Sequence, residues 1–165
     1  MTAYARHLSA IVLPILLALA PLAGAQAPAE QLLPADNLQQ SAAAARAEGK
    51  PLMLMFSLPE CPYCKVVRRN YLLPLLRNPV PAERPQIREL TMTSRKAIID
   101  FDGTVTTPVA VAKRYQVTVA PTLVFVGPTG EKLIDSLVGG DHSFYDAYLE
   151  RALSASRQAL AAPAR

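Results

Sequence analysis

The chain has 165 residues and carries 17 basic against 13 acidic side chains, which gives a formal net charge of +4. This excess of positive charge is small and scattered, which argues against nucleic-acid binding. The length suits one domain with a single hydrophobic core. Only two cysteines are present, Cys61 and Cys64, and Pro62 and Tyr63 separate them.

The N-terminal residues have the composition of a secretory signal peptide. A short basic region around Arg6 precedes the apolar run LSAIVLPILLALAPLA, and the small residues AGAQA follow. A transmembrane anchor is the competing interpretation, but Pro14 interrupts the run and leaves too short a stretch for a span of roughly 20 residues. We expect residues 1–25 to be the signal peptide, with cleavage after Ala25 or Ala27. Export predicts that the mature protein is in the periplasm, where disulfides persist. We expect no stable membrane insertion after the signal peptide is cleaved.

The mature chain is expected to have a flexible segment at 26–33, one domain at 34–157 and a frayed tail at 158–165. The domain alternates helical and strand patterns. Helices are predicted within 34–51, 61–76, 107–117 and 143–157, and strands at 52–56, 86–92, 122–126 and 132–138. The last two strands are joined by a tight turn and are therefore expected to pair antiparallel. This order predicts an α/β fold with a mixed central sheet and helices on both faces.

Capping residues and apolar runs give more detail in the first half of the domain. Asp36 is the expected N-cap of the first helix, and Gly49 is expected to follow its last turn. The buried face of that helix would hold Leu38, Ala42 and Ala45. Residues 52–56 form an uninterrupted apolar run, as expected of a strand that is covered on both faces. Pro62 fits the first turn of the next helix, and Pro74 should interrupt that helix.

Similar signals occur in the second half. Residues 93–107 contain an Asp-Gly pair that favours a small hairpin or an ordered loop. Thr107 is the expected N-cap of a short helix that begins at Pro108. The last helix is expected to bury Phe144, Tyr148 and Ala152, which share one face.

The two cysteines allow three interpretations. As a structural staple the pair would close a loop of only about four residues, which gives little stabilisation in the loop-entropy model. A structural zinc site needs four ligands, and the mature chain offers the two cysteines and His142. Copper binding through the two sulfurs lacks a supporting cluster of methionine or histidine. A reversible redox couple is the third possibility.

The position of the pair favours the redox couple, because it lies where a strand gives way to a helix. The unpaired N–H groups and dipole of a helix N-terminus favour a thiolate and lower the pKa of the first cysteine. Cys61 would therefore attack a partner disulfide, and Cys64 would resolve the mixed disulfide. Glu60 opposes thiolate formation, whereas Lys65 and Arg68 are expected to favour it.

From about residue 35 to 153 the chain resembles proteins of the thioredoxin fold. The C-P-Y-C motif, the later segment VAPTLVF and the turn GPTGEKL occur in the family's order, and about 60 residues separate Cys61 from Pro121. More narrowly, IIDFDGTVTTPVAVAKRYQVTVAPTLVF is similar to exported bacterial SoxW-like thioredoxins. The resemblance implies a thioredoxin fold and a cis peptide bond before Pro121. It also implies that Ala120 pairs with the backbone of a partner protein.

The resemblance implies a substrate groove formed by Pro121, Ala120, Pro62 and Tyr63 beside the cysteines. The chain also departs from the cytosolic thioredoxins at two positions. Glu60 replaces the tryptophan that precedes their first cysteine, and Met55 occupies the position that matches their buried aspartate. Another base or water would then have to accept the proton of the resolving cysteine.

These observations predict a periplasmic thiol-disulfide oxidoreductase that acts on protein thiols and disulfides, more as a reductant than as an oxidant. Its electrons would reside in the Cys61–Cys64 pair, so we expect no organic cofactor and no metal. Similarity to the SoxW-like proteins implies a membrane electron donor, and we expect a monomer. The alternatives are an oxidant that donates its disulfide and a non-enzymatic module that binds a partner or copper through the two thiols.

Overall fold

The computed structural model describes residues 31–139 and 143–162, so the expected signal peptide and His142 lie outside the described residues. The helical elements are α1 (Leu38–Ala47), α2 (Pro62–Val67), the π-helical turn η1 (Arg68–Leu72), α3 (Leu73–Leu76), the 3₁₀ turn η2 (Pro81–Glu83), α4 (Pro108–Arg114) and α5 (Tyr145–Ala161). The strands are β1 (Leu52–Ser57), β2 (Gln86–Thr91), β3 (Ile98–Ile99), β4 (Val105–Thr106), β5 (Thr122–Val126) and β6 (Leu137–Val138).

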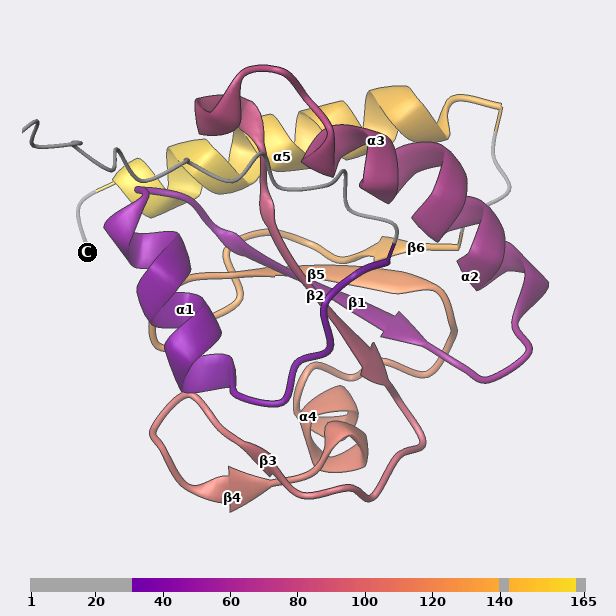
Figure 1. The fold of residues 1–165 in the computed structure, drawn as a ribbon, viewed down its shortest axis with the longest axis vertical. Coiled ribbons are helices and arrows are strands. Elements are labelled where there is room, and N and C mark those ends of the chain that lie inside the picture. The colour runs from indigo at the N-terminus through magenta and orange to yellow at the C-terminus, as the bar shows by residue number, and fades with distance from the viewer. Residues whose placement is uncertain (1–30, 140–142, 163–165) are drawn as a thin grey trace, which may run out of the picture.

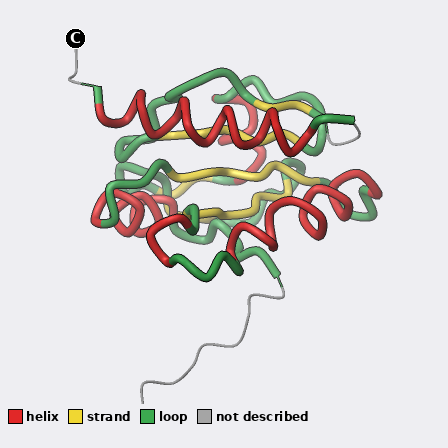
Figure 2. Tube along the Cα trace, turned by 90° about the horizontal axis from the view of Figure 1, so that it is seen from above, coloured by secondary structure: helices red, strands yellow, loops and turns green. Residues whose placement is uncertain are grey.

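The main sheet is mixed, with the strand order β2-β1-β5-β6. β1 pairs parallel with β2 and antiparallel with β5, and β5 pairs antiparallel with β6. Helices lie on both sides of the strands, as Figures 1 and 2 show. The predicted mixed sheet with two helical layers is therefore confirmed.

Two hydrophobic cores explain why the apolar run of β1 is uninterrupted. Leu52, Leu54 and Phe56 point into the core under α1 and α4. Met53 and Met55 point into the core under α2, η1, α3 and α5. All five side chains are at most 1% exposed. Successive strand residues face opposite sides, so both sets must be apolar when both faces are covered.

The last strand is shorter than expected, since most of 132–138 lies outside the ladder. Lys132 still forms a bridge with Val126, and Leu137 pairs with Leu123. Between these two pairs, four residues on one side face two on the other, so the chain bulges away from β5. The strand expected over seven residues is reduced to β6.

The first helix begins one residue later than the sequence predicts. Asn37, rather than Asp36, is the N-cap of α1, and its side-chain oxygen accepts a backbone N–H three residues on at 2.8 Å. The Asp36 carbonyl accepts the N–H of Ile99, and its carboxylate pairs with Lys96 at 3.0 Å, so residue 36 is held outside the helix. The expected role of Gly49 is confirmed, because it follows the helix with a φ of 65°.

The helix that follows the cysteines is interrupted, as predicted from Pro74. Proline lacks the N–H that an α-helix needs, and the turn that precedes Pro74, η1, is π-helical. This wider turn places the consecutive residues Leu72 and Leu73 in the core. Tyr71 and Leu75, which share a face in a regular helix, are only partly buried against that core.

The register predicted for the last helix is wrong by about one residue. Phe144 is 68% exposed and Tyr148 is 45% exposed, and only Ala152 of the expected face packs partly against the core. The residues that α5 buries are Tyr145, Leu149, Leu153 and Ser156. Tyr145 packs on Tyr71 with ring centroids 4.7 Å apart, so this tyrosine sets the buried face.

Both ends of the domain are more extensively structured than expected. The N–H of Glu89 donates to the Leu33 carbonyl at 2.9 Å, and its carbonyl accepts the N–H of Ala35 at 3.0 Å. The described residues 31–33, which were expected to be flexible, thus lead into the outer edge of β2. At the other end α5 continues through 158–161, where a frayed tail was expected.

The segment between β2 and α4 forms the small hairpin β3–β4, one of the two possibilities predicted for it. Thr107 caps α4 and Pro108 begins it, as expected. The hairpin is anchored by Asp100, whose carboxylate binds the Arg114 guanidinium through two hydrogen bonds, one of 2.9 Å. Asp100 is 5% exposed and also accepts the N–H of Phe101 at 2.8 Å. The hydrogen bond from Arg114 lowers the pKa of Asp100.

Replacing Asp100 with Asn is expected to lower the free energy of unfolding by about 1–3 kcal/mol, because it removes the charge that Arg114 binds. A lowered pKa in the folded state stabilises the protein above the pKa of the unfolded aspartate, about 3.9. The difference between wild type and variant should thus persist at neutral pH and shrink as the pH falls below about 4. Urea unfolding at several pH values measures this, and a difference that grows in acid would contradict the assignment.

Candidate functional site

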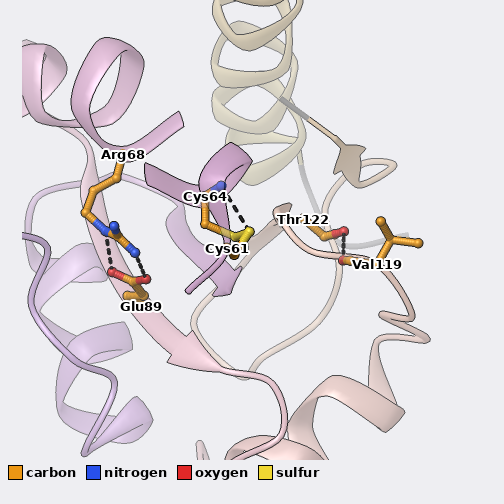
Figure 3. Close-up of a disulfide and its surroundings, with 6 residues drawn as sticks. All are labelled: Cys61, Cys64, Arg68, Glu89, Val119 and Thr122. Carbon is orange, nitrogen blue, oxygen red and sulfur yellow. Dashed lines mark hydrogen bonds and ion pairs between the residues drawn. A yellow bond between two sulfur atoms is a disulfide. The ribbon is translucent and has the colours of Figure 1, made fainter. Parts of the chain in front are cut away.

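The two cysteines form a disulfide at the N-terminus of α2, just after the turn that follows β1 (Figure 3). Cys61 is the N-cap of this helix, and its sulfur accepts the backbone N–H of Cys64 at 3.1 Å. Pro62 occupies the first turn, as predicted. The sulfur of Cys61 therefore lies at the helix end whose unpaired N–H groups favour negative charge.

The two cysteines differ in burial. Cys64 is 1% exposed and belongs to the core under α2 and α5, whereas Cys61 is only partly buried against that core. Tyr63, between them, is 53% exposed. Cys61 is thus partly accessible to solvent, whereas Cys64 is enclosed in the protein.

The segment that contains Ala120 and Pro121 packs against the same core as the cysteines. Ala120 is partly buried against the cluster that includes Cys64, and the peptide bond between Ala120 and Pro121 is cis. The Thr122 hydroxyl donates to the Val119 carbonyl at 2.7 Å and fixes the approach to β5 (Figure 3). Ala120, far from the cysteines in sequence, therefore packs against the same core cluster as Cys61 and Cys64.

Lys65 and Arg68, the two cations expected to favour a thiolate, are both paired with carboxylates. Lys65 binds Glu60 at 3.1 Å, with both side chains exposed. Arg68 donates two hydrogen bonds to the Glu89 carboxylate, at 3.0 and 2.5 Å (Figure 3). This bonding raises the pKa of Arg68. Each cation thus has a carboxylate partner, which offsets its effect on a thiolate.

Glu89 is the site residue that sequence reasoning missed. Its side chain is 17% exposed, and β2 places it beside Met55 in the parallel pairing with β1. Met55 is fully buried in the same core as Cys64, so position 55 supplies no carboxylate. The available signal was an acidic residue inside a predicted strand, since a partly buried glutamate requires a partner.

The described residues offer few other candidates for binding. Residues 31–139 and 143–162 contain no group of three or more His, Cys, Asp or Glu side chains that could hold a metal ion. In the same ranges no helix has the length and apolar character needed to cross a membrane.

Comparisons with known proteins point to one family. The sequence model of the Thioredoxin-like domain matches residues 38–151. The structure of mitochondrial thioredoxin 3 from Saccharomyces cerevisiae is 20% identical, has a TM-score of 0.48, and aligns over 74% of this chain and 93% of that chain. The thioredoxin of Malassezia sympodialis is 18% identical, with a TM-score of 0.49 and coverages of 82% and 98%. A thioredoxin-fold protein from Helicobacter pylori is 20% identical, with a TM-score of 0.49 and coverages of 73% and 85%.

No curated protein matches the chain. The family match covers more than half of the chain and includes both cysteines and Pro121. The mixed sheet between two helical layers agrees with it. The chain therefore belongs to the thioredoxin-like domain family, and this fold with its C-x-x-C pair supports thiol-disulfide oxidoreductase activity in general terms.

Proposed function

We propose that this protein is a periplasmic reductant of protein disulfides, with Cys61 as the nucleophile and Cys64 as the resolving thiol. The observation that carries the proposal is the unequal burial of the pair at a helix N-terminus. Cys61 caps α2 at the surface, whereas Cys64 is 1% exposed beneath it. A nucleophile must reach a partner, and a resolving thiol needs to reach only its neighbour.

The reaction transfers two electrons from the cysteine pair to the partner disulfide. The Cys61 thiolate attacks one partner sulfur, which breaks the partner disulfide and forms a mixed disulfide, and the released partner thiolate takes up a proton. Cys64 then loses its proton and attacks the Cys61 sulfur, which forms the Cys61–Cys64 disulfide and releases the second partner thiol. The partner is reduced and the pair is oxidised, so the pair must be reduced again before the next cycle.

The proposed substrate groove consists of Tyr63, Pro62, Ala120 and Pro121. Tyr63 is exposed beside the disulfide, and Ala120 is partly buried against the same core as Cys61. A proline has no N–H and a short side chain, so an extended partner segment can approach Cys61 and pair with the backbone of Ala120. The small side chain of Ala120 would admit varied partner sequences.

The location and the electron source are proposed from the sequence. The signal-like residues 1–25 support export to the periplasm, and the similarity to SoxW-like thioredoxins supports a membrane donor that keeps the pair reduced. We propose that the exported domain acts as a monomer and needs no cofactor besides the Cys61–Cys64 pair.

The direction of electron flow is tested by equilibrating the purified protein with reduced and oxidised glutathione. A reductant is expected to have a reduction potential close to that of thioredoxin, about −270 mV. A value near the −120 mV of a strong oxidant would overturn the proposed direction and assign the protein as a donor of disulfides.

A further inference from the structure

Two ion pairs lie beside the cysteine helix, and they differ in their contact with water. The side chains of Lys65 and Glu60 are 63% and 91% exposed. Those of Arg68 and Glu89 are 27% and 17% exposed. Water and salt screen exposed charges, whereas partly buried charges act over longer distances. The Arg68–Glu89 pair is therefore the one able to influence the cysteines.

Arg68 lies on the Cys64 side of the helix. Its backbone N–H donates to the Cys64 carbonyl, so the two residues are one turn apart, and residues at this spacing share a helix face. Glu89 lies beside Met55 in the sheet, and Met55 shares a core with Cys64. Both members of the ion pair thus flank the structure that holds the buried cysteine (Figure 3).

Glu89 is fixed on two sides. Its backbone bonds to Leu33 and Ala35 along the outer edge of β2, and its carboxylate accepts two hydrogen bonds from Arg68. A carboxylate held in this way cancels most of the field that the guanidinium would otherwise exert. The N-terminal segment therefore helps to place this carboxylate.

We propose that Glu89 is a positioning residue for thiol exchange, because it holds Arg68 and neutralises its charge. An unpaired arginine would stabilise a thiolate in the reduced cysteine pair, and the pairing with Glu89 removes that stabilisation. A stabilised thiolate stabilises the reduced form and makes a disulfide more oxidising. Glu89 thus keeps the reduction potential of the Cys61–Cys64 pair low. It supplies a carboxylate next to position 55, where the chain has methionine. The inference rests on the proposed function because it explains the direction of electron flow in that reaction.

The test measures the equilibrium constant for reduction of the Cys61–Cys64 disulfide by glutathione at neutral pH. Two glutathione thiols become one glutathione disulfide, and their two electrons and two protons convert the protein disulfide to two thiols. Glu89→Gln leaves Arg68 unneutralised, so the constant is expected to rise about two- to tenfold; tenfold corresponds to about 30 mV. The thiolate fraction, measured by ultraviolet absorbance, should rise with it.

The matched variants separate this electrostatic role from a structural one. Arg68→Gln leaves the carboxylate alone and should lower the constant, whereas the double variant should return it close to the wild-type value. Glu60→Gln frees the exposed Lys65 and is expected to change the constant less than about twofold. General damage to the fold would not move the single variants in opposite directions and restore the double variant.

The inference is overturned if Glu89→Gln leaves the constant unchanged, or if the double variant stays at the Glu89→Gln value. Circular dichroism of each variant verifies that the compared proteins are folded. The equilibrium measurement does not require activity on proteins. If the wild type fails to reduce protein disulfides, the proposed function is rejected. If the equilibrium constants of the two single variants still shift in opposite directions, this inference stands.

Discussion

A Cys64→Ser variant is expected to accumulate a covalent complex with its protein partners, on the order of one partner per chain, and to lose turnover. Cys61 still attacks a partner disulfide, but no second thiol remains to release the mixed disulfide. Non-reducing gels of the variant after incubation with disulfide-containing proteins measure the complex, and mass spectrometry identifies the partners.

Cys61→Ser is the matched control, because it retains the buried thiol of the pair and removes the one that is only partly buried. It should form no covalent complex under the same conditions. If Cys61→Ser forms complexes and Cys64→Ser does not, the proposed roles of the two cysteines are reversed. If neither forms a complex, protein disulfides are not substrates of this site.

Phe56→Ala is expected to destabilise the protein by about 3–5 kcal/mol, the usual cost of truncating a buried phenylalanine. Phe56 is fully buried in β1, and its ring lies 6.3 Å from that of Tyr115 in an edge-to-face arrangement. Removing the ring leaves a cavity between the sheet and the α1–α4 layer. Urea unfolding monitored by circular dichroism measures the loss.

Phe144→Ala makes the same chemical change at a residue that is 68% exposed, so its effect should stay within about 0.5 kcal/mol. The comparison also tests the register of α5, since the sequence pattern had placed Phe144 in the core. Equal losses for the two variants would show that Phe144 is buried and that the observed register is wrong.

Local patterns predicted the elements that position the site. The apolar run of β1, the proline in the first turn of α2 and the C-x-x-C spacing each depend on residues close in sequence. They indicated a strand that gives way to a helix at the cysteines, and the structure confirms this. The order of strands and helices was sufficient to predict the mixed sheet.

Features that depend on distant contacts were not predicted. The face that α5 buries is set by Tyr145 packing on Tyr71, and the sequence periodicity of the helix alone favoured Phe144 and Tyr148. β6 pairs with β5 over only two residues, because the chain bulges between Lys132 and Leu137. The sequence of 132–138 contains no signal for this bulge. The partner of Arg68 is 21 residues away, so its pairing with Glu89 appears only when β2 is placed beside β1.

The paired charges change the account of the cysteine chemistry. The sequence places two cations, Lys65 and Arg68, and one carboxylate, Glu60, beside the pair, and their net effect on a thiolate does not follow from the sequence. The structure places two carboxylates beside the same two cations. We therefore expect any thiolate stabilisation at Cys61 in the reduced protein to come mainly from the helix N-terminus rather than from a net positive charge.

Reduction of insulin disulfides, with dithiothreitol as the electron source, tests the central claim most directly. Wild type is expected to accelerate the reduction catalytically, and Cys61→Ser is expected to leave it at the rate of dithiothreitol alone. If wild type and Cys61→Ser were equally inactive, the pair would not catalyse disulfide exchange on proteins. That result would contradict the account and favour a binding role for the two thiols.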